Sequence, residues 1–355
     1  MTEIFSLRLA SARQMAGFSM QELADMIGIS KQAISKYEKG LMMPESTTLI
    51  KMASFLGVSE TYFYNETPEE TINLVSIWHR DKEKLFEDEM VVIKKQTVDF
   101  LHRLFELEKI AHAQQDFKNP VSDMIIKNRK DAEKAAKVVR KKWGLGNGAI
   151  SNVVNFLEDQ GIRVYEVMQS EKFEGFSAWA GKIPVIVINK SIKEITRIRF
   201  TALHELGHIV LQIEKELSIT DIERICDAFA GELLLPTEIL IMELGFRRTR
   251  ISIEELKTLK VKYGISVKAI MVKAACDSII TWDTFKVINE DYQSSFEAEA
   301  DFGSYHGIEE PRRFVQLLCN CIMENKVSIG KAASLYNMKE KQFKEQFKLT
   351  EYQHN

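Results

Sequence analysis

Two histidines and a glutamate near the middle of the chain have the types and spacing needed to bind a metal and activate water. They lie in the stretch Phe200-Thr-Ala-Leu-His-Glu-Leu-Gly-His208, where His204 and His208 are four residues apart. On a helix this spacing stacks both imidazoles on one face, so that they can share one tetrahedral zinc ion. Glu205 can then act as general base toward a metal-bound water. The alternative is a buried helix that carries two incidental histidines.

A third ligand must come from another segment, because catalytic zinc is usually held by three protein groups. No histidine follows His208 before His306, so a carboxylate or Cys226 is favoured. Residues 221–236 have helical apolar spacing, with Glu223 and Asp227 at its border. One of these two can bind metal while the other holds a ligating histidine by its second ring nitrogen. Glu223 is the favoured ligand, and Cys226 is its rival. The acidic candidates downstream of His208 are Glu214, Glu216, Asp221, Glu223, Asp227 and Glu232.

This region resembles the ImmA/IrrE metallopeptidases. The resemblance covers roughly residues 130–280 and includes the His204–His208 stretch and the segment Glu223-x-x-Cys-Asp227-x-Phe-Ala-x-Glu-Leu-Leu-Leu-Pro236. It implies a zincin-like fold in which His204, His208 and Glu223 bind Zn2+ and Glu205 is catalytic. The family usually has Asn where this chain has Asp227, and a ligand-orienting role for Asp227 remains compatible with that change. Members often cleave a repressor that is made beside them.

The first 65 residues predict a bundle of five short helices. Ser19-Met20-Gln21-Glu22 is a capping box that opens the second helix, and Gly28-Ile29-Ser30 forms a tight turn before the third. This helix-turn-helix pattern resembles the Xre/Cro repressor-type family, most closely over residues 30–40. Met20 departs from the family, which often has a phosphate-contacting Gln there. This change implies either weaker anchoring to the DNA backbone or anchoring by Gln21 instead.

The Xre/Cro resemblance implies that the third helix reads double-stranded DNA. The residues that would face base edges are Lys31, Gln32, Ser35 and Lys36. Gln suits adenine and Lys suits guanine in the major groove. Residues 1–65 nevertheless contain six Lys and Arg residues against six Asp and Glu residues, so the basic surface is local. The alternative is a helical module that binds another protein.

Composition sets the wider limits. A chain of 355 residues with 45% hydrophobic residues can form two or three domains with buried cores. The net charge of −3 gives no bulk affinity for polyanions, and the four cysteines form no disulfide framework. No apolar run is long enough to span a membrane, and charged residues interrupt the first residues where a signal peptide would lie. A cytoplasmic protein is therefore expected.

We expect an α+β fold that is predominantly α, with four parts. Residues 1–65 form the DNA-binding bundle, residues 66–119 a helical connector or dimerising hairpin, and residues 120–250 the peptidase domain. The peptidase domain is expected to hold a small antiparallel sheet, with residues 176–179 on the edge that pairs with substrate. Residues 251–355 contain two hairpins that resemble helix-turn-helix units. Lysines in the second one leave contact with nucleic acid or a partner open.

Together these features predict a DNA-binding regulator with a zinc endopeptidase domain that cleaves a repressor or itself. DNA binding would concentrate the peptidase near a promoter-bound substrate. One alternative is a transcription factor in which zinc or a ligand is sensed without catalysis, and another is an antitoxin-like regulator. An intact Glu205 favours the enzyme. The sequence names no group that stabilises the oxyanion, for which Tyr165 and Arg197 are only weak candidates.

Overall fold

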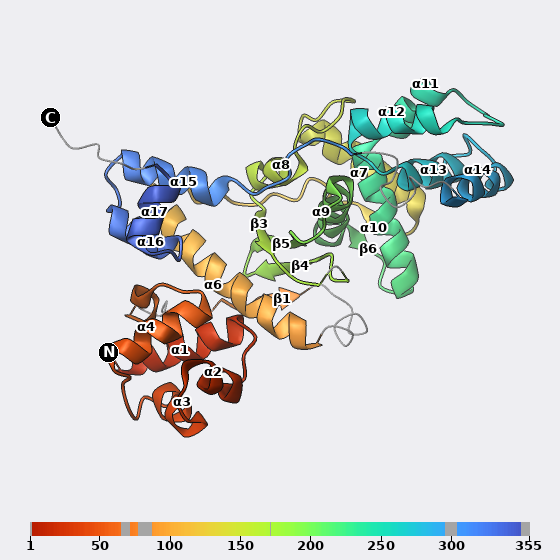
Figure 1. The fold of residues 1–355 in the computed structure, drawn as a ribbon. Coiled ribbons are helices and arrows are strands. Elements are labelled where there is room, and N and C mark those ends of the chain that lie inside the picture. Colours follow the sequence, from red (N-terminus) through yellow and green to blue (C-terminus); the bar gives the residue numbers. More distant parts are fainter. Residues whose placement is uncertain (1, 65–71, 77–86, 171, 295–303, 349–355) are drawn as a thin grey trace. The chain divides into compact units, whose positions relative to one another are not determined.

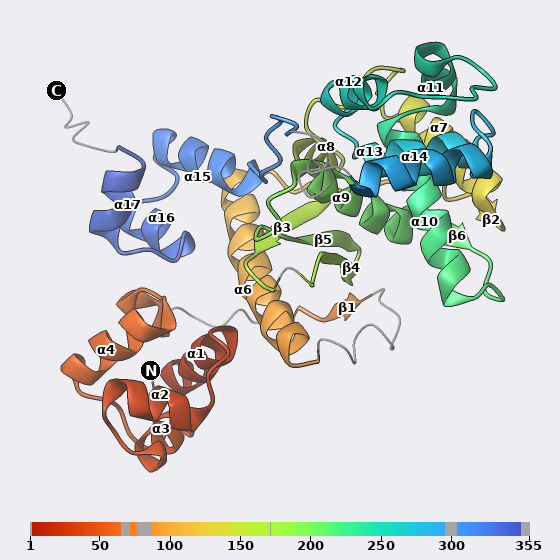
Figure 2. The same cartoon turned by 45° about the vertical axis from the view of Figure 1, so that its right-hand side comes forward.

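The computed structural model describes residues 2–64, 72–76, 87–170, 172–294 and 304–348. The chain forms two compact units, which Figures 1 and 2 draw as ribbons. Unit 1 contains Met1–Leu74, Asp81–Gln115 and Arg312–Asn355, and unit 2 contains Val75–Arg80 and Asp116–Pro311. The fold is mostly helical with a small sheet, as predicted. Among the described residues, no helix is long and apolar enough to cross a membrane.

Unit 1 begins with the predicted bundle, whose elements are α1 (Thr2–Met15), α2 (Met20–Ile27), α3 (Lys31–Glu38), α4 (Ser46–Leu56) and the 3-10 turn η1 (Glu60–Tyr64) (Figure 2). The capping box at Ser19 is present, because its side chain accepts from Glu22 N and the Glu22 carboxylate accepts from Ser19 N. Gly28 ends α2 with φ of 76°, a conformation that glycine adopts without strain. The turn between α2 and α3 is therefore set by local sequence.

A buried ion pair fixes α3 against α1. Arg13 Nε donates to Glu38 Oε1 at 2.6 Å, and Arg13 Nη2 donates to Glu38 Oε2 at 2.9 Å. Arg13 Nη1 also donates to the carbonyl oxygen of Phe18 at 2.8 Å. This two-pronged geometry restricts the orientation of both helices. The opposite face of α3 is left toward solvent.

The remaining helices of unit 1 are α6 (Glu87–Ala111), α15 (Arg313–Met323), α16 (Ile329–Leu335) and α17 (Glu340–Gln346). They share an apolar core in which Leu104 and Leu107 of α6 meet Phe314, Leu318 and Phe343 of the last three helices. Residues 312–348 thus belong to the same unit as α6. The boundaries between the units therefore do not coincide with the domain boundaries at residues 119 and 250 that the sequence suggested. Local sequence patterns do not reveal this pairing of distant segments.

Three basic side chains of the second C-terminal hairpin form ion pairs within unit 1. Lys339 Nζ lies 2.7 Å from Glu60 Oε1, and Lys344 Nζ lies 2.6 Å from Glu340 Oε1. Lys331 Nζ lies 2.5 Å from Glu106 Oε1. These three lysines are therefore paired locally, whereas Lys341 and Lys348 are exposed.

Unit 2 contains a four-stranded sheet in the order β1-β4-β5-β3. Its strands are β1 (Leu74–Ser76), β3 (Arg163–Val167), β4 (Gly175–Ala180) and β5 (Ile183–Asn189). β4 and β5 pair antiparallel, but β3 and β5 pair parallel, so the predicted antiparallel sheet is wrong. β5, whose residues from Pro184 to Asn189 are all buried, lies between the other two. Because β4 is antiparallel to β5 and β3 is parallel to it, β3 and β4 run in opposite directions on the two sides of β5.

The prediction of an edge strand at residues 176–179 is also wrong. β4 contains these residues and has β5 on one side and β1 on the other. The edges of the sheet are β1 and β3. A three-residue strand that precedes β4 by about a hundred positions gives no local signal of this pairing.

Helices of unit 2 pack against its sheet, and two short strands, β2 (Ile125–Ile126) and β6 (Gln212–Ile213), pair parallel. The helices are α7 (Arg129–Lys142), α8 (Val153–Asp159), α9 (Ile195–Val210), α10 (Ile219–Leu234), α11 (Thr237–Leu244), α12 (Ile253–Tyr263), α13 (Val267–Cys276) and α14 (Trp282–Ser294). α8 packs on β3, and α9 packs on β4 and β5 and is crossed by α10 (Figure 1). At the crossing, a Cβ on Gly207 would lie 3.2 Å from Cys226 Sγ. A residue larger than glycine would push α9 and α10 apart.

Candidate metal centre

Helix α9 presents the two predicted histidine ligands side by side. One turn of helix separates His204 from His208, and their Nε2 atoms are 3.1 Å apart. The rings stand edge to face, with their planes at 70°. Their side chains are 13% and 6% exposed, so the pair faces a partly covered site rather than open solvent. The i, i+4 spacing therefore directs both Nε2 atoms at one point, the ligand focus, as the sequence predicts.

Glu223 on α10 reaches the same focus. Its Oε2 lies 3.5 Å from His204 Nε2, and its Oε1 lies 3.5 Å from His208 Nε2. One ligand atom from each of the three residues lies within 4.8 Å of the others, and this is the cluster of metal-binding type found among the described residues. Two ligands of a tetrahedral zinc at about 2.1 Å are about 3.4 Å apart. The observed separations of 3.1 and 3.5 Å therefore fit a zinc ion.

Asp227 and Cys226 each approach the far side of one histidine ring. His204 Nδ1 donates to Asp227 Oδ1 at 2.8 Å, which leaves His204 Nε2 directed at the focus. Cys226 Sγ lies 3.5 Å from His208 Nδ1, the ring nitrogen opposite the focus. Cys226 is thus placed against a ligand rather than among the clustered ligand atoms. The geometry favours Glu223 over its rival.

The carboxylates around His204 make this position attractive for positive charge. Burial alone lowers the pKa of His204, but the hydrogen bonds to Asp227 and Glu223, together with the charge of Glu205, raise that pKa to about 10. The same carboxylates would stabilise a metal cation. The donor set of two imidazoles and one carboxylate is one that catalytic zinc uses.

Glu205, the predicted base, is buried beside the cluster and contacts the sheet. Its Oε2 accepts a hydrogen bond of 2.7 Å from Ser177 Oγ on β4. Sequence reasoning missed this contact, although it singled out residues 176–179 for another reason. The alternation of side chains along β4 marks Ser177 as facing one side of the sheet, but not which helix covers that side.

The candidate oxyanion groups are not brought to the cluster by any described contact. Arg197 forms an ion pair with Glu174, whose other oxygen accepts from Thr201 Oγ1 at 3.2 Å. Burial by itself raises the pKa of Glu174, but the bonds from Arg197 and Thr201 outweigh it and lower that pKa. Tyr165 lies on β3, which is separated from β4 by β5. Neither side chain is assigned an oxyanion role.

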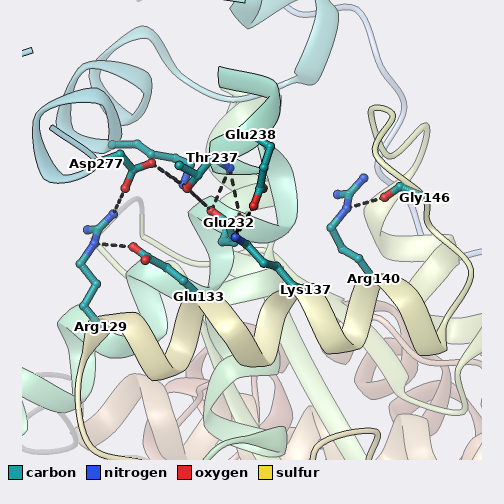
Figure 3. Close-up of polar contacts among 10 residues, drawn as sticks. Arg129, Glu133, Lys137, Arg140, Gly146, Glu232, Thr237, Glu238 and Asp277 are labelled. Atoms are coloured by element: carbon teal, nitrogen blue, oxygen red, sulfur yellow. Dashed lines mark hydrogen bonds and ion pairs between the residues drawn. The ribbon is translucent and has the colours of Figure 1, made fainter. Parts of the chain in front are cut away.

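The other acidic candidates have different partners. Glu214 Oε1 lies 3.3 Å from Lys127 Nζ, and Asp221 Oδ2 accepts from Ser218 Oγ at 2.6 Å. Glu232 is fully buried and pairs with Lys273 Nζ at 2.6 Å. Figure 3 shows Glu232 in a polar network that joins α7, α10, α11 and Asp277. Glu216 is exposed. These residues surround the site's helices without entering the cluster.

The predicted DNA-contacting residues share the solvent face of α3. Lys31, Gln32 and Lys36 are exposed, and Ser35 is half-buried, whereas Ile34 and Tyr37 are in the core of the bundle. Ser30 caps the helix by accepting from Ala33 N at 3.2 Å. The first two turns of α3 are therefore free to enter a groove, as base readout by such a helix requires.

Both parts of the chain match known families. Residues 9–63 match the Helix-turn-helix family, and residues 157–274 match the IrrE N-terminal-like domain, a peptidase family. The second match includes the histidines, Glu205, Glu223 and Asp227. The chain therefore contains a helix-turn-helix domain and an IrrE-like domain of a peptidase family.

Two relatives from Bacillus subtilis strain 168 are similar to parts of this chain. The SPbeta prophage-derived uncharacterized HTH-type transcriptional regulator YonR is 39% identical over 64 residues, which are 18% of this chain and 59% of YonR. The HTH-type transcriptional regulator ImmR is 26% identical over 152 residues, which are 43% of this chain and 92% of ImmR. The chain thus spans less than two thirds of YonR but nearly all of ImmR.

A solved structure, the apo form of ComR from S. thermophilus, aligns over 98% of this chain and 96% of its own. Its sequence identity is 13% and its TM-score is 0.17. At these values the alignment carries no argument about fold or function.

Proposed function

We propose that the protein is a DNA-binding transcriptional regulator whose second unit is a zinc-dependent endopeptidase. One observation carries the peptidase proposal. The Nε2 atoms of His204 and His208 and a Glu223 carboxylate converge at separations of 3.1–3.5 Å, on helices that also carry Glu205. This arrangement fits a zinc ion with a neighbouring carboxylate base.

In this proposal, His204, His208 and Glu223 would hold the zinc ion. Bound zinc supplies Lewis acidity and lowers the pKa of a coordinated water to about 7. Glu205 takes a proton from the attacking water and passes it to the departing amine. Asp227 holds the His204 ring by its Nδ1–H, so that Nε2 stays directed at the ligand focus. The two carboxylates thus have separate tasks.

The proposed partners follow from the two domains. Operator DNA would bind the exposed face of α3 through Lys31, Gln32 and Lys36, with Ser35 beside them. The protein substrate would be a repressor or this chain itself. The similarity to ImmR, an HTH-type transcriptional regulator, supports the regulatory role. DNA binding near such a repressor would raise the local concentration of the peptidase. A regulator of this kind acts in the cytoplasm, where its operator lies.

A single substitution tests catalysis. Glu205→Gln should retain zinc, because Glu205 is not one of the clustered ligands, and should abolish cleavage by removing the base. We expect cells with the wild-type protein to yield new N-termini, either in this chain or in a neighbouring repressor, that are missing with Glu205→Gln. Intact mass and N-terminal sequencing would detect them, with exposed Glu216→Gln as the control. Identical fragments from all three zinc-loaded proteins would instead favour a zinc-sensing regulator without turnover.

A further inference from the structure

Strand β4 and helix α9 are matched residue by residue where they touch. Alternate residues of β4 point to the same face of the sheet, and residues four apart on α9 point to the same face of the helix. A Cβ on Gly175 would lie 3.0 Å from Thr201 Cγ2, so these two residues oppose each other. Ser177 follows Gly175 by two residues on the strand, and Glu205 follows Thr201 by four residues on the helix, so Ser177 opposes Glu205 in turn. The strand is therefore in register with the metal-ligand helix.

The contact between Ser177 and Glu205 is polar and sealed from water. Ser177 is fully buried and Glu205 is 4% exposed. Ser177 Oγ donates to Glu205 Oε2 at 2.7 Å, a length typical of a hydroxyl bound to a carboxylate. A buried hydroxyl is unfavourable unless it is hydrogen-bonded. If this position served packing alone, an alanine side chain could occupy it without the free-energy cost of burying a hydroxyl group.

We propose that Ser177 is a positioning residue that holds the Glu205 carboxylate in place for proton transfer. The proposal rests on the peptidase function proposed above. A glutamate side chain has three rotatable bonds, and a base must be held within about 0.5 Å of its working position. The Ser177 bond restricts rotation of the carboxylate, while the main chain of β4 is held in turn by pairing with β5. β4 would thus serve the site through this one hydroxyl.

The test uses a probe that needs no knowledge of the natural substrate. Acetohydroxamic acid binds a catalytic metal and gives its hydroxyl proton to the adjacent base, so its Kd reports where the Glu205 carboxylate lies. The full-length protein is loaded with cobalt(II), and binding is followed by visible absorbance. We expect Ser177→Ala to weaken binding about tenfold, the loss typical for a hydrogen bond to a charged group. The cobalt content and thermal midpoint should stay unchanged.

Thr201→Val is the matched control, because it removes a hydroxyl from the same strand–helix contact, where Thr201 bonds to Glu174 instead of Glu205. Thr201→Val should leave the Kd unchanged. Ser177→Thr, which keeps a hydroxyl, should bind the hydroxamate as tightly as wild type. Equal affinity in Ser177→Ala and wild type would overturn the proposal, as would a loss of cobalt or stability in Ser177→Ala that accounts for the weaker binding. If Glu205→Gln binds the hydroxamate as tightly as wild type, the base assignment in the proposed function fails instead.

Discussion

At the scale of single residues, the charges around His204 explain why a metal would bind here. Asp227 binds the ring nitrogen opposite the ligand focus at 2.8 Å, and Glu223 binds from the focus itself. The first contact orients the ring and the second would ligate the metal. Both residues lie on one face of α10, one turn apart, so a single helix supplies the ligand and its support.

The role of Asp227 predicts an ordering of variants. Asp227→Leu should weaken zinc binding by about 10–100-fold, because His204 loses the group that fixes its ring. Asp227→Asn should retain most of the affinity, since the amide oxygen still accepts from Nδ1–H. Competition with a chelating dye would measure both, with Asp221→Leu as control, because half-buried Asp221 lies on the same helix outside the cluster. Equal affinity in all four proteins would show that the ring needs no partner at Nδ1.

At the scale of elements, a buried ionic network ties the helices behind the site together (Figure 3). Lys273 of α13 lies 2.6 Å from Glu232 of α10 and 2.9 Å from Asp277. Arg129 of α7 binds Asp277 at 3.1 Å, and Thr237 at the start of α11 donates to Glu232. The helix that carries Glu223 and Asp227 is thereby anchored at its C-terminal end, away from the cluster.

Breaking this network should destabilise unit 2. Lys273→Met leaves the carboxylates of Glu232 and Asp277, at 0% and 3% exposure, short of a cation, and should cost about 3–5 kcal/mol of unfolding free energy. Urea denaturation followed by tryptophan fluorescence suits the test, because the three tryptophans among the described residues, Trp143, Trp179 and Trp282, lie in unit 2. Lys286→Met, which breaks an exposed pair with Asp283, should change stability by less than about 0.5 kcal/mol. Equal effects would show that the network is no more than surface pairing.

At the scale of the whole molecule, the proposed DNA-contacting residues and the candidate metal centre belong to different units. The exposed residues of α3 lie in unit 1, while the cluster and its supports lie in unit 2. The buried residues of α1–α4 form one apolar core within unit 1, and those around α9 and α10 form another within unit 2. The two proposed activities should therefore respond to different substitutions.

This separation predicts that base preference and zinc content can be changed independently. In selection from a randomised duplex library, Gln32→Ala should relax base preference at one position, a loss of about 1–3 kcal/mol, yet retain the wild-type zinc content. Lys51→Ala, an exposed change on α4, should keep the preference. Chelation should remove zinc and leave the preference intact. An unchanged profile for Gln32→Ala would place the recognition surface elsewhere.

Local patterns in the sequence were sufficient for the features that arise within one helix or turn. The spacing of His204 and His208 appears directly as neighbouring imidazoles, and the Ser19 capping box and the Gly28 turn formed where predicted. Their geometry follows from the period of a helix or from the conformational freedom of one glycine, which act over only a few residues.

Only the tertiary structure decided the features that depend on contacts between distant segments. In the tertiary structure β3 pairs parallel to β5, and β1 lies beside β4 in the sheet. Cys226 contacts the ring nitrogen of His208 opposite the ligand focus, and Ser177 donates to Glu205. The tertiary structure also joined α6 with the last three helices in one core. A strand's alternation or a helix's apolar stripe shows that a face will be buried, but the partner that buries it is chosen by the packing of the whole chain.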